Sequence, residues 1–282
     1  MAPVATSSLS YTPTTMSSPT TTSGHPFKNS SAQAAPSHLP NNAQIPPPPP
    51  LPKSSGRPQE VRHAPARTSF EFDPIEDALA AFARGEFLVV ADDEGRENEG
   101  DLIIAGSEVS TEKMAWMIRH TSGYICISLP AERLEELEIP MMVNQNEDPH
   151  RTAYTVTVDY KFGTTTGISA HDRALTARAL ASSQVSPSTF SRPGHMVPLR
   201  ARPGGTLTRR GHTESGVDLC MLTGLPQAGV LCELVNEDEQ GTMMRRDACR
   251  AFADRWGLKM ISVDMISEYR KSLEHGKVNG TL

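Results

Sequence analysis

A break in composition near residue 66 most constrains what this chain can fold into. The first 60 residues contain 31 serine, threonine or proline residues, and residues 1–66 hold 14 of the 23 prolines. Large apolar side chains are too sparse there to offset the entropy that ordering would cost. We therefore predict a disordered tail over 1–66, one folded domain over 67–275 and a flexible C-terminus over 276–282.

Five consecutive prolines, Pro46–Pro50, favour a polyproline II rod within this tail. Such a rod can dock weakly in an aromatic-lined groove of a partner, or it can be a stiff, solvated linker, which is the commoner use. The tail is rich in serine and threonine, as organelle transit peptides are, but its first 27 residues contain no lysine or arginine. We expect a cytoplasmic protein, with mitochondrial targeting as the alternative.

Charge divides at the same boundary. Residues 1–66 carry four basic groups and one acidic group, whereas the remainder carries 23 basic and 32 acidic groups. A net-acidic domain lacks the basic face that nucleic-acid binding needs, although a small basic pocket for a phosphorylated metabolite remains compatible. No apolar run approaches the roughly 20 residues of a membrane span. We therefore expect neither a nucleic-acid nor a membrane partner.

The four cysteines, Cys126, Cys220, Cys232 and Cys249, form no C-x-x-C pair. This spacing argues against a zinc cluster and fits free thiols in a reducing compartment.

Helical and extended patterns alternate through the rest of the chain, which predicts helices layered on a sheet. Asp73 is expected to cap the first helix, with Pro74 at its first position. The expected helices span 74–84, 111–120, 131–137, 170–181, 213–222, 246–256 and 263–272, and the expected strands span 87–91, 124–129, 154–158, 229–235 and 258–261. Strand order does not follow from these patterns.

The most charged segment, 92–101, directly follows an expected buried strand. Six of its ten residues are acidic and two are glycine. Dense carboxylate oxygens suit Mg²⁺ or Mn²⁺, and Arg96 among them could meet a substrate oxygen. A solvated acidic loop is the equally weighted alternative.

A second segment, 209–214, has the composition of an anion-binding cradle. Two arginines, a glycine and a threonine precede an expected helix, whose N-terminus adds partial positive charge. Its His212 is a candidate metal ligand. A third segment, 163–169, is a glycine- and hydroxyl-rich turn that could be either a phosphate cradle or a simple capped turn.

Glu233 lies inside the apolar run 230–235, where a carboxylate is costly unless it is paired or functional. It is therefore the strongest general acid/base candidate from the residues alone. His195 follows a constrained Arg-Pro-Gly loop.

Taken together, these segments resemble the 3,4-dihydroxy-2-butanone 4-phosphate synthase family. The stretch Asp-Asp-Glu-Gly-Arg-Glu-Asn-Glu-Gly-Asp-Leu-Ile at 92–103 resembles its signature, and the similarity extends over roughly 70–272. The other matching segments are 119–126, 163–173, 192–195, 204–214 and 229–236. The monofunctional fungal type is indicated by 167–173 and 241–245.

The resemblance implies a lyase of riboflavin biosynthesis that converts D-ribulose 5-phosphate to L-3,4-dihydroxy-2-butanone 4-phosphate and formate. It implies a divalent metal, Mg²⁺ or Mn²⁺, and a homodimer with active sites near the subunit interface. It also implies an α+β fold: a single domain with a mixed β-sheet sandwiched between helical layers.

Individual roles are likewise implied by the resemblance. Glu97 and His212 match metal ligands, His195 and Glu233 match residues essential for catalysis, and Cys126 matches a cysteine near the site that glutathione modifies in some members. Positions matching substrate-binding residues are Arg96, Asp101, Thr152, Arg209, Arg210, Gly211, His212 and Thr213. Two other functions are compatible with these residues: a metal-dependent phosphosugar isomerase, and a catalytically inactive scaffold that acts through the tail.

Overall fold

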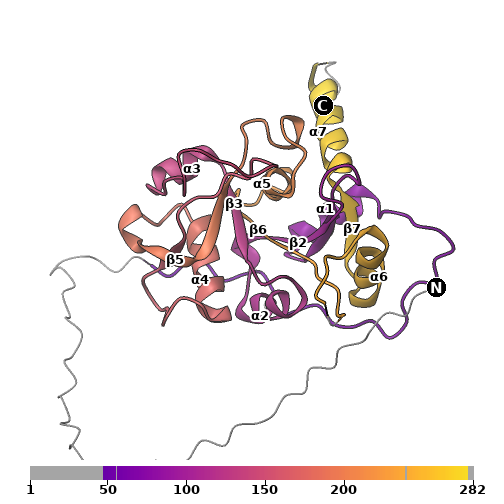
Figure 1. The fold of residues 1–282 in the computed structure, drawn as a ribbon, viewed down its shortest axis with the longest axis horizontal. Helices are drawn as coiled ribbons and strands as arrows, with labels where there is room; N and C mark the ends of the chain where they lie inside the picture. Colours follow the sequence, from indigo (N-terminus) through magenta and orange to yellow (C-terminus); the bar gives the residue numbers. More distant parts are fainter. Residues whose placement is uncertain (1–46, 55, 239, 279–282) are drawn as a thin grey trace, which may run out of the picture. The chain divides into compact units, whose positions relative to one another are not determined.

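A computed structural model describes residues 47–54, 56–238 and 240–278. Within these ranges seven strands form one mixed sheet in the order β4-β5-β3-β6-β2-β1-β7 (Figure 1). The pairs β1–β7 and β3–β5 are parallel and the other neighbours are antiparallel. The strands are β1 (Leu88–Ala91), β2 (Gly100–Ala105), β3 (Cys126–Leu129), β4 (Val158–Tyr160), β5 (Phe190–Arg200), β6 (Gly229–Glu233) and β7 (Lys259–Ser262).

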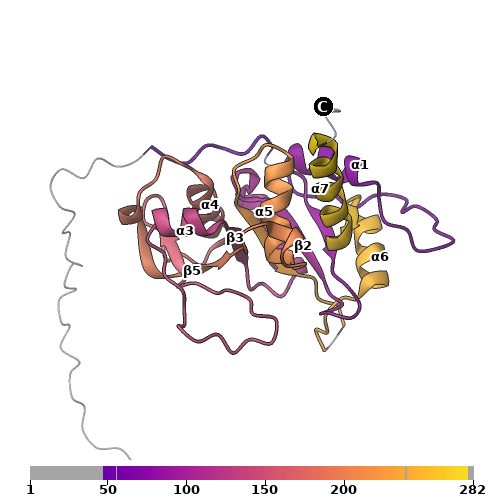
Figure 2. The same ribbon diagram turned by 90° about the horizontal axis from the view of Figure 1, so that it is seen from above.

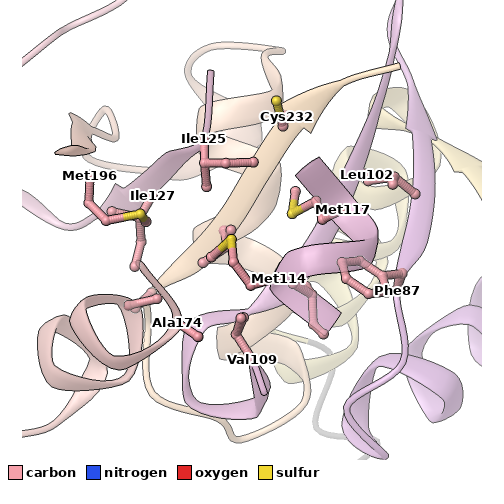
Figure 3. Close-up of a cluster of buried hydrophobic side chains, with 14 of the residues drawn as sticks. Phe87, Leu102, Val109, Met114, Met117, Ile125, Ile127, Ala174, Met196 and Cys232 are labelled. Atoms are coloured by element: carbon pink, nitrogen blue, oxygen red, sulfur yellow. The ribbon is translucent and has the colours of Figure 1, made fainter. Parts of the chain in front are cut away.

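Helices cover both faces of the sheet, because alternate side chains of the buried strands point to opposite sides (Figure 2). One face packs against α2 (Thr111–His120), α3 (Ala131–Glu136), α4 (Ala170–Ala181) and α6 (Arg246–Trp256). The other face packs against α1 (Ile75–Ala83), α5 (His212–Leu222) and α7 (Val263–Val278). In Figure 3, Met114 and Met117 of α2 lie in one buried cluster with Ile125, Ile127, Leu102 and Cys232. The expected α+β sandwich is confirmed.

Close packing of α5 on β6 fixes the position of the helix that carries His212. Nine of its residues, from His212 to Cys220, are buried. A Cβ on Gly229 would lie 2.6 Å from the Cα of Gly216, so these two glycines allow helix and strand to touch by their backbones. The N-terminus of α5 is thereby held at a fixed place beside the end of β6.

The sequence patterns do not predict two of the strands, β2 and β5. β2 begins at Gly100 and includes Asp101, which the charge pattern assigns to the acidic loop. β5 runs through Pro193 and Gly194, residues that normally interrupt a strand. The register between β4 and β5 shifts from Ser191, opposite Asp159, to Met196, opposite Val158, so Pro193 and Gly194 lie in a bulge of the strand.

Other boundaries also differ from expectation. Residues 154–158 form isolated bridges at Tyr154 and Thr155, and the strand β4 begins only at Val158. Asp73 does not cap α1, because its carboxylate instead accepts bonds from Arg250 and the Met260 amide. Helix α7 continues to Val278, past the expected helix end at 272.

The described part of the chain contains no helix that is both long enough and apolar enough to cross a membrane. Pro46 of the proline run, the first 45 residues and residues 279–282 lie outside the described residues.

The described part of the tail, 47–66, forms no helix or strand but contacts the domain. The Lys53 amide donates to Glu108 at 2.7 Å, and the Val61 amide donates to the Arg255 carbonyl at 2.9 Å. Glu60 also pairs with Arg255, at 2.8 Å. The domain boundary at 66 stays a prediction, but this arm is held by backbone bonds as well as by ion pairs.

These contacts predict different effects for two truncations. Deleting residues 1–46 should leave both kcat and Tm unchanged. Deleting 1–66 should also leave kcat unchanged but lower Tm by about 2–4 °C, because the few backbone bonds of the arm contribute about 1 kcal/mol together, while its exposed ion pairs contribute little. Differential scanning fluorimetry of the two proteins measures this. Equal Tm values for both deletions would show that the arm does not stabilise the domain.

Candidate active site

One pocket gathers most of the site residues named from the sequence. It lies where the β1–β2 loop, the ends of β2 and β6 and the N-terminus of α5 meet. The expected residues that line it are Arg96, Glu97, Asp101, Cys126, Thr152, Arg209, His212, Thr213 and Glu233. Glu99, Tyr154, Leu199 and Leu231 complete the lining.

The acidic segment is a hairpin loop rather than a free solvated run. Ala91 of β1 pairs with Gly100 of β2, so residues 92–99 connect two antiparallel strands. Asp92 organises this loop, since its buried carboxylate accepts bonds from the amides of Glu97 and Glu99 at 3.2 and 2.9 Å. The side chains of Glu97 and Glu99 therefore line the pocket, while the carboxylate of Asp92 bonds to the backbone of the loop.

His212 and Glu97 face each other across the pocket. The Nδ1 atom of His212 lies 3.7 Å from Glu97 Oε2 and 3.6 Å from Asp101 Oδ1. Its Nε2 lies 3.0 Å from the Val90 carbonyl. Because a carbonyl can only accept, Nε2 carries a proton and Nδ1 is oriented toward the carboxylates, as in histidines that bind metals.

This donor set fits a divalent cation. Adjacent ligands of Mg²⁺ lie about 3 Å apart, so Glu97 Oε2 and His212 Nδ1, which are 3.7 Å apart, could share one ion after a small side-chain movement. Asp101 Oδ1 is buried without a hydrogen-bond partner, which leaves an oxygen available to a bound species. Asp92, Glu97 and His212 also bring ligand atoms within 4.8 Å of one another.

The pocket holds an excess of negative charge. Burial disfavours the ionised form of Glu97, but hydrogen bonds and charge from His212 and Arg96 outweigh this and lower its pKa to about 2. Burial similarly opposes the charged form of His212, yet Asp101 and Glu97 raise its pKa to about 9. Several carboxylates thus surround one histidine, and this excess of negative charge favours a divalent cation, which would displace the proton from Nδ1 of His212 on binding.

Glu233 is the cross-strand partner of Asp101. β2 and β6 align these residues directly opposite each other. Glu233 is the last residue of β6 and is only partly buried, so it is less enclosed than its apolar neighbours suggest. Its Oε2 accepts a bond from the Ser122 hydroxyl at 2.8 Å. Two carboxyl groups therefore meet at one wall of the pocket.

The basic end of the pocket is built around Arg209. Glu214, a buried residue of α5, accepts from Arg209 Nη1 at 2.6 Å and so holds the guanidinium in place. Arg209 Nη2 lies 3.4 Å from the Thr152 hydroxyl. With Thr213 on the first turn of α5, these groups place hydrogen-bond donors at the end of the pocket where the sequence predicts an anion cradle.

Arg210 is not part of this cradle. Its half-exposed guanidinium turns toward α7 and pairs with Asp264 at 2.7 Å. The amide of Gly211 is bonded to the Arg209 carbonyl at 3.0 Å. The structure thus places the Arg210 side chain outside the pocket lining, and substrate binding by Arg210 stays a prediction.

His195 lies outside the pocket lining. Its side chain is 41% exposed, and its Nδ1 lies 2.6 Å from Asp159 Oδ2. The His195 amide also donates to Asp159 Oδ1, at 2.8 Å. This pair is a carboxylate-oriented imidazole, the arrangement of a general base. No sequence pattern singles out Asp159, because only the β4–β5 pairing brings it to His195.

The turn 163–169 is a capped turn and not a phosphate cradle. Ser169 accepts from the Asp172 amide at 3.0 Å, and none of its residues lines the pocket. The sequence analysis did not predict Tyr154 and Glu214 as site residues. Glu214 does lie within the segment 209–214, which was predicted to bind an anion.

Cys126 lies on the pocket wall but is only 4% exposed. Burial raises the pKa of its thiol well above the usual value, and the neighbouring Glu233 adds to this effect. Because the thiolate is the reactive form, this cysteine is a poor nucleophile at neutral pH.

We expect a bulky thiol reagent to modify Cys126 slowly, with a rate that rises about tenfold per pH unit as the thiolate fraction grows. Substrate should protect the thiol, modification should block the pocket, and Cys126→Ser should remain active. Mass spectrometry of the labelled protein and an assay of its activity measure these effects. A folded but inactive serine variant would assign the thiol a chemical role.

Comparison with known proteins assigns this arrangement to a family. The family model for 3,4-dihydroxy-2-butanone 4-phosphate synthase matches residues 76–269. The synthase of that name from Schizosaccharomyces pombe is 61% identical over 198 residues, which cover 70% of this chain and 97% of the relative. The Saccharomyces cerevisiae protein of the same name is 52% identical over 206 residues, covering 71% and 99%.

Solved structures agree with the sequence relatives. A crystal structure of 3,4-dihydroxy-2-butanone 4-phosphate synthase in complex with two magnesium ions has a TM-score of 0.69 and 50% identity, covering 75% of this chain and all of the other. The Candida albicans synthase structure has a TM-score of 0.65 and 54% identity, covering 70% and 97%.

Proposed function

Because this chain belongs to the 3,4-dihydroxy-2-butanone 4-phosphate synthase family, we propose that the acidic pocket is its active site. The enzyme is a lyase of riboflavin biosynthesis that converts D-ribulose 5-phosphate to L-3,4-dihydroxy-2-butanone 4-phosphate and formate, with a divalent metal. The observation that carries the site assignment is the convergence of Glu97, Asp101, His212 and Glu233 on one pocket beside Arg209.

Glu97 and His212 would hold the metal, Mg²⁺ or Mn²⁺. When bound, the metal supplies positive charge that stabilises the vicinal oxygens of the sugar as the proton next to the ketone is removed. Arg96 contacts the Glu97 carboxylate and lines the same wall, so it is placed to bind a substrate oxygen. The Val90 carbonyl keeps the imidazole of His212 turned toward the site.

The phosphate of the substrate would sit at the basic end. Arg209 offers a planar set of donors whose direction is fixed by Glu214. The Thr152 hydroxyl and the first turn of α5, at Thr213, add neutral donors. Anchored there, the sugar chain extends toward Asp101 and Glu233.

Proton transfers at several carbons are needed for the skeletal rearrangement and the loss of formate. Asp101 and Glu233 lie opposite each other on adjacent strands and can exchange protons with neighbouring positions of one substrate. The Asp101 carboxyl has an unpartnered oxygen directed into this buried region. The Ser122 hydroxyl holds Glu233 in one orientation.

We further propose a homodimer in which His195 of one copy completes the pocket of the other. Within its own chain His195 is exposed and lies outside the pocket. Large apolar side chains are also exposed on segments near the pocket, and a second copy would bury them; these are Tyr124, Met142, Val143 and Ile168. Sedimentation should find a dimer, and a monomer with full activity would contradict this proposal.

Formate release tests the function directly. Purified protein incubated with ribulose 5-phosphate and Mg²⁺ should produce formate stoichiometrically with the four-carbon phosphate. A phosphosugar isomerase would share the first proton abstraction but release no formate, and a scaffold protein would consume no substrate. Either of those results would overturn the proposed activity.

A cytoplasmic location remains a proposal as well. It is supported by the four cysteines, which are all free thiols. Fluorescent fusions of the full chain and of the chain without residues 1–46 can test it, and a mitochondrial signal that requires those residues would favour the alternative.

A further inference from the structure

The first turn of α4 carries two buried charged side chains that lie outside the pocket lining. Asp172 is fully buried and Arg173 is 7% exposed. Burying a charge is unfavourable unless hydrogen bonds compensate. The partners of these two residues therefore show what the helix end holds in place.

Asp172 holds the turn 163–169. Its Oδ1 accepts from the Thr165 amide at 3.1 Å, and its Oδ2 accepts from the Thr165 hydroxyl at 2.8 Å and the Gly167 amide at 2.9 Å. Burial disfavours the ionised carboxylate, but these bonds prevail and lower the pKa of Asp172. The carboxylate is thus an ionised clamp on this turn.

Gly167 of that turn lies directly against the pair of Asp159 and His195. A Cβ at this position would lie 1.9 Å from Asp159 Oδ2 and 2.5 Å from His195 Nδ1. Its φ of +95° also favours glycine. The backbone of the turn therefore forms the support against which the imidazole and its carboxylate rest.

Arg173 reaches in another direction, toward the turn 121–124. Its Nη1 donates to the Gly123 carbonyl at 3.1 Å, while its buried Nε has no partner in the described structure. The neighbouring residue of that turn, Ser122, donates from its amide to the Glu233 carbonyl and from its hydroxyl to Glu233 Oε2, both at 2.8 Å. The guanidinium thus braces the segment that orients the carboxylate.

We propose that Asp172 and Arg173 are positioning residues that set both catalytic groups from one rigid helix end. Asp172 acts on His195 through the turn 163–169, and Arg173 acts on Glu233 through the turn 121–124. The inference rests on the proposed function, since it takes His195 and Glu233 as catalytic. Adjacent residues of one helix then fix two groups that belong to different strands.

Arg178 provides a matched control for Arg173. It lies on the same helix and is also 7% exposed. Its Nη1 donates to the Val109 carbonyl at 2.6 Å, and its buried Nε likewise has no described partner. Arg173→Gln and Arg178→Gln should lower Tm by similar amounts. Only Arg173→Gln should lower kcat, by about 10- to 100-fold with KM within about twofold, because a small misplacement of a catalytic group is costly.

Double variants separate positioning from a general loss of structure. Arg173→Gln should have no further effect on kcat in a Glu233→Gln background, and Asp172→Asn should have none in a His195→Asn background. Arg173→Lys, which keeps a donor, should recover part of the lost kcat. The contrary result is that each substitution lowers kcat as much in its double variant as it does in the wild-type enzyme. Asp172 and Arg173 would then have only structural roles.

The wild-type assay keeps the two hypotheses apart. If the unmodified enzyme releases no formate, the proposed function fails and the variants need not be compared. If it does release formate and Arg173→Gln retains the kcat of Arg178→Gln, the proposed function stands and the positioning role of Arg173 is overturned.

Discussion

Replacing Glu97 by glutamine should abolish formate release, with a loss of at least about 10³-fold in kcat/KM. The two side chains have nearly the same shape, so the hairpin loop should keep its conformation. The amide lacks the negative charge that faces His212 at 3.7 Å. It also loses the attraction of Arg96. The measurements are formate release and Mn²⁺ binding, and both should fall together.

Glu94 is the matched control for this change. It lies in the same loop, is exposed, and pairs with Arg246 away from the pocket. Glu94→Gln should retain activity and metal binding, since exposed ion pairs contribute little. Near-normal turnover of Glu97→Gln at saturating Mg²⁺ would remove Glu97 from the metal site.

The site could be predicted from the sequence to the extent that its residues are neighbours along the chain. The acidic loop and the basic segment each sit between elements that local patterns indicate, and their charges are visible without a fold. Neither pattern shows that Glu97 of one faces His212 of the other. That proximity depends on the packing of α5 against β6 through Gly216 and Gly229, which are 13 residues apart.

For a related reason, the sequence does not predict how exposed Glu233 is or which strand carries His195. Glu233 follows apolar residues and so looks enclosed, yet it is the last residue of β6 and opens onto the pocket. His195 looks like a loop residue because Pro193 and Gly194 precede it, yet it belongs to β5 and bonds Asp159 on the neighbouring strand. Strand pairing is non-local, so propensity alone does not determine it.

His195→Asn and Glu233→Gln should each lower kcat by roughly 10²–10⁴-fold with little change in KM. The phosphate cradle at Arg209 and the metal ligands are untouched by these changes, so ribulose 5-phosphate should still bind. If the two groups act in the same proton transfers, the double variant should lose far less than the product of the single losses. Steady-state kinetics and titration calorimetry provide the measurements.

Exposed residues of the same types serve as controls. His63→Asn and Glu237→Gln alter side chains outside the pocket and should leave kcat unchanged. Loss of substrate binding in the His195 or Glu233 variant would show that the residue positions the substrate and that the acid/base assignment is wrong.

Mixing the two inactive variants also tests how His195 reaches the site. If it enters the pocket of the partner copy, a mixed dimer contains one site with both an intact Glu233 and an intact His195. Its other site then carries both substitutions. Random reassociation should restore on the order of a quarter of the wild-type activity. If both groups serve the site of their own chain, no mixed dimer has an intact site and activity stays at the level of the single variants. That result would contradict the shared site while leaving both residues catalytic, because the single-variant kinetics do not depend on which copy supplies the imidazole.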